Sequence, residues 1–211
     1  MKSTAERKAS LRAEVWGRRR AMSTADRAAT GVRIAAHGIA WASAAVPPGG
    51  TVTAYRSVGA EPPTLELVEG LHTAGFHVLL PICEPGRQLS WVEWHPGVDY
   101  ERSAFAPVLE PVGPRLDARA VHEGNDARPP LAAIVLPATA LDAEGRRLGQ
   151  GGGYYDRFLA RLDDGGARVS TAAVVFDDEV LPAGGVPDEP LDRRVDAALT
   201  PSGIRPLRNR A

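Results

Sequence analysis

Six short stretches of the chain are apolar and rich in β-branched residues, and turn residues separate them. Two of them, Phe76–Cys83 and Leu131–Leu141, are continuously apolar, which is typical of strands covered on both faces. Thr51–Val58 instead alternates, as a half-covered strand does. The predicted strands are Thr51–Val58, Phe76–Cys83, Leu89–Trp94, Leu131–Leu141, Val169–Phe176 and Val195–Thr200.

Helical spacing of apolar residues marks the N-terminal part of the chain. Ser3 and Glu6 have the spacing of a capping box, and Leu11 and Val15 follow at helical intervals, so we expect a first helix over about Thr4–Arg20. A second helix is predicted after a cap at Ser23–Asp26. Its apolar stripe would be Val32, Ala35, Ala36 and Ile39.

Two further helices are predicted between strands. Pro63–Gly75 reads as a helix that Gly75 closes. A glycine run ending at Gly153 precedes another helix, whose apolar face would be Phe158, Leu159 and Leu162.

The alternation of strands and helices predicts an α/β protein with a mostly parallel sheet. We expect one domain over residues 1–211, with two leading helices at about 4–42 and an α/β core at about 50–200. The stretch Gly113–Pro130 is rich in Pro, Gly and charged residues, and we interpret it as a long surface loop rather than a domain linker.

The net charge and the cysteine count exclude some classes of site and make some partners unexpected. The 211 residues carry a formal net charge of −1, so the overall balance gives no reason to expect nucleic acid or an anionic membrane as a partner. Cys83 is the single cysteine, which excludes an intramolecular disulfide and a cysteine zinc site; a buried apolar role is favoured over a nucleophilic one. Without a signal core or an apolar run of membrane-spanning length, we expect a cytoplasmic protein. We separately expect a monomer whose partners are small molecules.

The stretch Gly145–Leu162, GRRLGQGGGYYDRFLARL, holds the most distinctive chemistry. It would lie beyond a strand and before a helix, where backbone N–H groups can hold phosphate oxygens. Arg146 and Arg147 add positive charge. The stretch lacks the Lys-Ser or Lys-Thr of a Walker A loop, and Tyr154 breaks the dinucleotide fingerprint. A tight turn is the alternative, but four glycines in five residues favour an anion site.

Asp156 falls in the first turn of the predicted helix. A carboxylate there stabilises the helix dipole without any other role. Beside a phosphate it would be repelled unless a cation lay between them, and Mg²⁺ commonly bridges a carboxylate and phosphates. Asp156 is therefore a candidate metal ligand only if the phosphate interpretation is right.

Lys8 and Arg12 stand four residues apart and so share one face of the first helix. Spacing alone favours a solvated basic face, with Glu6 and Glu14 relieving the repulsion. The alternative is an anion held between the two cations.

The glycine-loop stretch GRRLGQGGGYYDRFLA closely resembles the signature of the 5-formyltetrahydrofolate cyclo-ligase family, also called methenyltetrahydrofolate synthetases. The resemblance extends from about Lys8 to Thr200. Its other segments are RKASLR, YRSVGAEPPT, IVLPATALDAEGRRLG, FDDEVLP and PDEPLD, in that order. It implies a three-layer α/β/α fold of the kind found in ribose-phosphate isomerases and CoA transferases.

The resemblance also implies an activity and a set of residues. The activity is ATP- and Mg²⁺-dependent closure of 5-formyltetrahydrofolate to 5,10-methenyltetrahydrofolate, with release of ADP and phosphate. ATP contacts would come from Lys8, Arg12, Arg147, Leu148, Gly149, Gln150, Gly151, Gly152, Gly153, Tyr154 and Tyr155. Folate contacts would come from Arg56, Glu61, Gln150, Gly151, Gly152, Gly153 and Tyr154, and Mg²⁺ ligands would be Asp156 and Asp188.

The chain departs from the family pattern near the last of these residues. Glu179 stands where the family often has Gln, and Pro187 stands where it often has His before the aspartate. No general base is evident, and Glu61 and Asp142 cannot be ranked from sequence. One rival function is a CoA transferase or a sugar-phosphate isomerase on the same fold, and in a CoA transferase Glu61 would be the acyl carrier. The other rival is a nucleotide- or folate-binding protein without catalysis.

Overall fold

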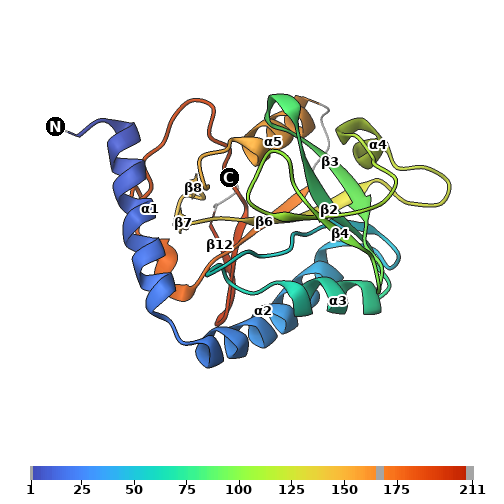
Figure 1. Ribbon diagram of the computed structural model, residues 1–211, viewed down its shortest axis with the longest axis horizontal. Helices are drawn as coiled ribbons and strands as arrows, with labels where there is room; N and C mark the ends of the chain where they lie inside the picture. The colour runs from blue at the N-terminus through green and yellow to red at the C-terminus, as the bar shows by residue number, and fades with distance from the viewer. Residues whose placement is uncertain (1, 165–168, 208–211) are drawn as a thin grey trace.

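The structure is a computed structural model that describes residues 2–164 and 169–207. Its helices are α1 (Thr4–Ala21), α2 (Thr24–Ala45), α3 (Leu65–Thr73), α4 (Ala118–Glu123) and α5 (Tyr154–Asp164), with 3-10 turns at Pro85–Arg87 and Asp177–Glu179. Its strands are β1 (Thr51–Thr53), β2 (His77–Glu84), β3 (Gln88–Glu93), β4 (Tyr100–Arg102), β5 (Leu109–Pro111), β6 (Leu131–Pro137), β7 (Ala140–Asp142), β8 (Arg147–Leu148), β9 (Ser170–Val174), β10 (Val180–Leu181), β11 (Ala197–Thr200) and β12 (Gly203–Pro206). Figure 1 gives their arrangement.

A seven-stranded sheet in the order β12-β11-β9-β6-β1-β2-β3 forms the centre of the fold. The five inner strands are parallel, and the edge strands β3 and β12 are antiparallel to their neighbours. From β1 the chain builds the sheet outward in one direction through β2, and from β6 in the other. The order therefore reverses between β1 and β6, which leaves a crevice at their carboxyl ends.

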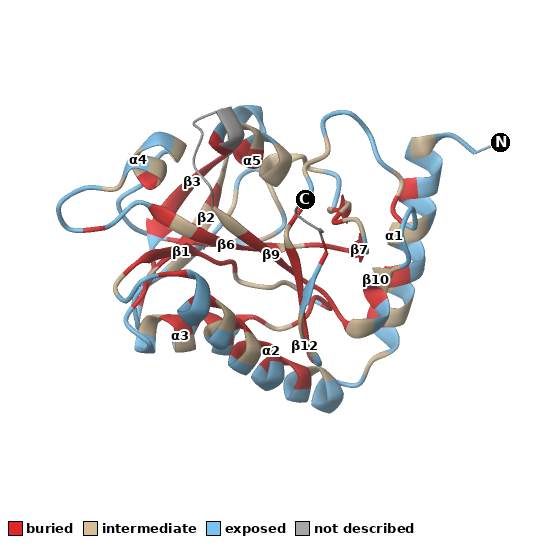
Figure 2. Cartoon of the chain, turned by 180° about the vertical axis from the view of Figure 1, so that it is seen from behind, coloured by how far each residue is buried: buried red, intermediate tan, exposed pale blue. Residues whose placement is uncertain are grey.

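Helices cover both faces of this sheet. Along β6, Ala133 and Val135 pack in the cluster that contains α2 and α3, whereas Ile134 and Leu136 pack in the cluster that contains α4 and α5. Figure 1 shows these two helix pairs on opposite sides of the sheet, and Figure 2 shows the inner strands buried. The expected three-layer α/β/α fold with a mostly parallel sheet is confirmed.

Helix α1 lies across one end of the sheet, apart from both helical layers (Figure 1). Its Val15 packs in a small third cluster with Ala140, Leu148 and Val186. Nearby, Arg19 forms a two-pronged ion pair with Glu179 at 2.7 and 2.8 Å, and both side chains are 1% exposed. Removing one partner of such a pair costs about 3–5 kcal/mol, so this pair fixes α1 to the rest of the molecule.

Each predicted strand overlaps a strand of the structure, but two predictions were wrong in extent. The strand predicted over Leu131–Leu141 is divided into β6 and β7, which belong to different sheets. The strand predicted over Thr51–Val58 is shorter than expected. Only Thr51–Thr53 forms β1. Beyond it the chain turns, because Thr64 and Ser57 exchange side-chain hydrogen bonds with each other's backbone N–H groups and Thr64 Oγ1 donates to Tyr55 O. The alternating pattern therefore continues past the strand into a turn that faces the crevice.

Two predictions about helices were wrong. In α2, Val32 is 62% exposed and Ala36 is exposed, while Gly31 and Gly38 are buried, so glycines take positions of the buried stripe. The stretch Gly113–Pro130 is not wholly loop, because it contains α4, capped by Asp117 and closed by a Gly124 at φ 68°. An Asp cap and a closing glycine were a signal that the sequence already carried.

No helix in the described ranges is long and apolar enough to cross a membrane. The expectation of a single domain over residues 1–211 stays a prediction.

The buried glycine of α2 yields a stability prediction. A Cβ at Gly38 would lie 2.6 Å from Leu67 Cδ1 and 2.9 Å from Leu199 Cδ2, and both leucines are fully buried. We expect Gly38→Ala to lower the free energy of unfolding by about 1–3 kcal/mol, measured by urea denaturation. Gly17→Ala in α1 is the matched control: its Cβ would meet no described atom within 4 Å, so it should raise stability by roughly 0.5–1 kcal/mol. Equal effects would contradict the close approach of α2.

Candidate active site

A cavity of about 1050 Å³ opens where the strand order reverses. Its walls include Tyr55 and Arg56, which follow β1, and Pro137, which ends β6. This is the edge at which open parallel sheets bind ligands. Seven cationic side chains and four carboxylates line it, so the walls carry an excess of positive charge.

The glycine loop forms one wall of the cavity, between β8 and α5. Gly151 at φ 100° and Gly153 at φ 69° take a left-handed backbone that other residues rarely adopt. The loop thereby turns directly into the first turn of α5, whose leading N–H groups have no partner within the helix. Backbone donors and the positive end of a helix dipole thus face the cavity, as a phosphate site requires.

Helix α1 supplies the facing wall. Lys8, Arg12 and Trp16 lie four residues apart on one face and all line the cavity. Arg12 Nε donates to Gly149 O at 2.8 Å, which joins α1 directly to the glycine loop. Lys8 is only 7% exposed. The prediction of a solvated basic face, which spacing alone favoured, is therefore wrong. The C-terminal part of the chain folds over Lys8.

Two carboxylates that the sequence analysis did not single out hold Lys8 in place. Its Nζ lies 2.5 Å from Asp192 Oδ2 and 2.8 Å from Glu189 Oε2. Burial by itself would lower the pKa of Lys8, but the hydrogen bonds to Asp192 and Glu189 outweigh it and the pKa is raised. Lys8 therefore stays charged at the cavity wall.

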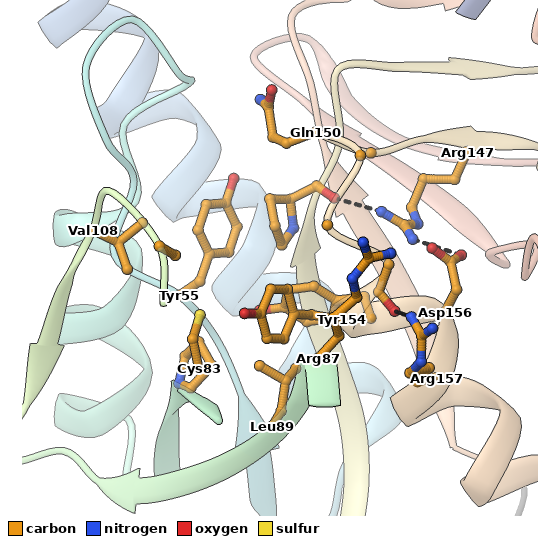
Figure 3. A pocket seen from close by; sticks show the side chains of 18 of the residues that line it. Tyr55, Cys83, Arg87, Leu89, Val108, Arg147, Gln150, Tyr154, Asp156 and Arg157 are labelled. Atoms are coloured by element: carbon orange, nitrogen blue, oxygen red, sulfur yellow. Dashed lines mark hydrogen bonds and ion pairs between the residues drawn. The ribbon is translucent and has the colours of Figure 1, made fainter. Parts of the chain in front are cut away.

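Asp156 lies at the start of α5, where its Oδ1 accepts from Arg147 Nη2 at 2.8 Å (Figure 3). The same oxygen accepts from the Arg193 backbone N–H at 3.2 Å. Among the described residues there is no cluster of three or more His, Cys, Asp or Glu side chains that could hold a metal. A single carboxylate fits Mg²⁺ that takes its other ligands from phosphate and water. Asp156 also suits the helix dipole, so both interpretations stay open.

Asp188 does not line the cavity. Its Oδ2 accepts from Arg146 Nε at 3.1 Å and lies 3.6 Å from Arg194 Nη2. Its role as a metal ligand stays a prediction. The departure at Glu179, where the family often has Gln, has a structural role. Glu179 is the buried partner of Arg19, and its carboxylate balances the charge of the guanidinium.

Glu61 and Arg56 line the part of the cavity next to β1. Glu61 is 6% exposed, and it accepts from the Val58 backbone N–H at 2.9 Å and from Gln150 Nε2 at 3.4 Å. Burial raises the pKa of Glu61, and these hydrogen bonds oppose the shift. The Arg56 guanidinium lies 4.9 Å from the ring centre of Tyr100. Asp142 is fully buried and is not part of the cavity lining.

The remaining walls are mostly apolar, although Arg87 also lies there. Figure 3 shows Tyr55, Cys83, Leu89 and Val108 on one side of Tyr154, with Arg147 and Asp156 on the other. The cavity thus has a cationic region beside the glycine loop and an apolar region beside β2. Such a division suits a ligand pair of which one is polyanionic and the other carries a flat ring system.

The structure brings together every predicted site residue except Asp188 and Arg146, which pair with each other outside the cavity lining. The residues on the cavity wall are Lys8, Arg12, Arg56, Glu61, Arg147, Leu148, Gly149, Gln150, Gly151, Gly152, Gly153, Tyr154, Tyr155 and Asp156. Their individual roles stay predictions. Sequence reasoning missed Trp16, although its spacing from Lys8 and Arg12 could have found it. It also missed Arg87 and the wall at 105–109, for which the sequence gives no comparable signal.

Comparison with known proteins agrees with this geometry. The profile of the 5-formyltetrahydrofolate cyclo-ligase family matches residues 4–201. The chain is 36% identical to the 5-formyltetrahydrofolate cyclo-ligase of Mycolicibacterium smegmatis, with 80% of this chain and 82% of that protein covered. It is 30% identical to the Escherichia coli K12 5-formyltetrahydrofolate cyclo-ligase, with 73% and 79% covered.

Solved structures show the same fold. The 5,10-methenyltetrahydrofolate synthetase of Aquifex aeolicus has a TM-score of 0.68 at 26% identity, with 97% of this chain and 94% of that chain covered. That of Mycoplasma pneumoniae has a TM-score of 0.66 at 16% identity, with 91% and 97% covered. The chain belongs to the 5-formyltetrahydrofolate cyclo-ligase family. The expected class, a ligase enzyme, is confirmed.

The cavity makes a prediction about its cysteine. Burial and the neighbouring Glu110 raise the pKa of the Cys83 thiol to about 12, so at pH 8 almost none of it is thiolate. We expect iodoacetamide to alkylate the folded protein roughly 50-fold more slowly than the protein in urea, once the higher nucleophilicity of a high-pKa thiolate is included. Mass spectrometry reads a single site, because the chain has one cysteine. Equal rates would mean an accessible, ionised thiol.

Proposed function

We propose that this protein catalyses the ATP- and Mg²⁺-dependent conversion of 5-formyltetrahydrofolate to 5,10-methenyltetrahydrofolate, with release of ADP and phosphate. The observation that carries the proposal is the cavity in which the glycine loop, the start of α5 and the cations of α1 meet. Family membership supports the same reaction and disfavours a CoA transferase or sugar-phosphate isomerase.

The chemistry needs ATP because a formyl amide is a poor electrophile and its oxygen a poor leaving group. The formyl oxygen attacks the γ-phosphorus and ADP leaves, which gives a phosphorylated iminium-like carbon. N10 attacks this carbon, the N10 proton is lost, and the oxygen leaves as phosphate. The enzyme's contribution to such a transfer is alignment and neutralisation of charge.

The cationic region is suited to the triphosphate. Lys8, Arg12 and Arg147 supply positive charge, and the loop from Arg147 to Tyr155 supplies backbone donors. Bound Mg²⁺ would neutralise charge on the phosphates and bring them into line for transfer, with Asp156 as its protein ligand. In the ligand-free protein Arg147 pairs with Asp156, and we propose that Arg147 turns to the phosphates when these bind.

The apolar region is suited to the reduced folate. Arg56 and Glu61 would contact its polar edge, while Tyr154, Leu89 and Val108 would pack on its rings. Of the two carboxylates considered as a base for the N10 proton, Glu61 is the better placed, because it lines the cavity and Asp142 does not. A cytoplasmic location and a monomeric state stay predictions.

The reaction has a direct test. Protein, Mg²⁺-ATP and 5-formyltetrahydrofolate are mixed, and the absorbance of the methenyl product is followed together with ADP release. We expect both to require all three components. No product above a heat-killed control would reject the proposal. Nucleotide binding without turnover would instead indicate the non-catalytic alternative.

The metal assignment predicts a specific phenotype. Asp156→Ala should lower kcat and raise the Mg²⁺ concentration for half-maximal activity by about 10- to 100-fold, with circular dichroism unchanged. Asp188→Ala is the matched comparison. Because Asp188 pairs with Arg146 and Arg194 outside the cavity lining, we expect a smaller shift. An unaltered Mg²⁺ dependence in Asp156→Ala would leave the carboxylate with its helix-dipole role alone.

A further inference from the structure

Trp16 makes a polar contact that the proposed reaction has not yet used. From α1 its indole Nε1–H donates to Gln150 Oε1 at 3.1 Å, across 134 residues of sequence. On the other side of that amide, Gln150 Nε2 donates to Glu61 Oε1 at 3.4 Å. A glutamine of the glycine loop thus lies between a tryptophan and the carboxylate proposed to meet the folate.

The two contacts fix which way the amide faces. The oxygen and nitrogen of a glutamine amide are nearly equal in shape, so packing cannot distinguish them. An indole N–H can only donate, so it requires Gln150 Oε1 on its side. The NH₂ group is then turned to Glu61, which as a carboxylate can only accept. Without the tryptophan donor, Gln150 would be held on this side by the 3.4 Å contact to Glu61 alone, and its side chain could leave Glu61 more easily.

The Trp16 ring is also held by a contact with Arg19. The Arg19 guanidinium lies 5.3 Å from the centre of the Trp16 ring and is locked by Glu179 on its other side. Arg19 Nη2 also donates to Ala138 O at 2.9 Å. A buried, multiply bonded cation against the ring restricts where the indole can lie. Contacts thus run without a break from the buried pair through Trp16 and Gln150 to Glu61.

We propose that Trp16 is a positioning residue for the reduced folate. Its indole N–H fixes the Gln150 amide with the NH₂ group toward Glu61, and so keeps both side chains in the arrangement that receives the folate. This inference rests on the proposed function, since it assumes that Glu61 and Gln150 contact that substrate. Its main effect is expected on the folate, because Gln150 joins Trp16 to Glu61, which belongs to the predicted folate contacts and not to the ATP contacts.

The test is a double-mutant cycle on Trp16→Phe and Gln150→Ala. Phenylalanine keeps an aromatic ring beside Arg19 and removes the N–H donor; the loss of ring size is matched by the Trp41→Phe control. We expect Trp16→Phe to raise the KM for 5-formyltetrahydrofolate about 3- to 10-fold and to change the KM for ATP by a smaller factor. In the Gln150→Ala background the same substitution should have no further effect, because Trp16 acts through Gln150.

Trp41→Phe in α2 is the matched control, because Trp41 packs on the core and does not line the cavity. It should leave the folate KM unchanged. An unchanged folate KM in Trp16→Phe would overturn the proposal. So would a Trp16→Phe effect that persists in full beside Gln150→Ala, because Trp16 would then act on the ligand or the fold directly.

A second measurement separates this inference from the proposed function. In the ligand-free protein, the side-chain amide resonances of Gln150 should shift in Trp16→Phe and not in Trp41→Phe. If wild type lacks turnover but these resonances respond as expected, the reaction is wrong and the positioning contact is right. If turnover is present and the resonances do not respond, the positioning contact is wrong.

Discussion

The buried ion pair between Arg19 and Glu179 is the interaction on which the assembly of the cavity depends. Helix α1 belongs to neither helical layer, and its apolar contact with the core is a small cluster around Val15. A guanidinium and a carboxylate removed from water cannot separate without leaving an unpaired buried charge. The pair therefore locks the position of α1, and with it the places of Lys8, Arg12 and Trp16 along the cavity wall.

The strand order of the sheet determines where the cavity opens opposite α1. Because the strand order reverses between β1 and β6, the turns that follow these strands separate and leave a crevice. The chain fills its two sides with different chemistry. Backbone donors and cations gather near α5, and aromatic and aliphatic side chains gather near β2. A single cavity can thereby hold a polyanion and a flat ring system next to each other, which a reaction between them requires.

Much of this could be read from the sequence, because the signals were local. The inner strands are continuous apolar runs, and the glycine loop carries its own motif. What sequence missed depends on tertiary contact. Glycines occupy buried positions in α2 because α3 comes close to it. The buried face of α2 is therefore marked partly by glycines and not by large apolar residues alone. Lys8 looked solvated because its partners Glu189 and Asp192 lie far along the chain. Asp188 likewise lies outside the cavity lining, where it contacts Arg146 and Arg194. No short motif reveals these contacts.

The Lys8 contacts also bear on the order in which the protein acquires its binding site. They join residues 181 and 184 positions apart, so Lys8 can meet its carboxylates only after Glu189 and Asp192 have been synthesised. The sheet strands from β1 to β9 can pair earlier, because they precede Glu189 in the sequence, whereas β11 and β12 follow it. A nascent chain that stops short of Glu189 can thus hold folded structure and still have an incomplete cavity. The cavity wall at Lys8 is therefore completed only after most strands of the central sheet have been made.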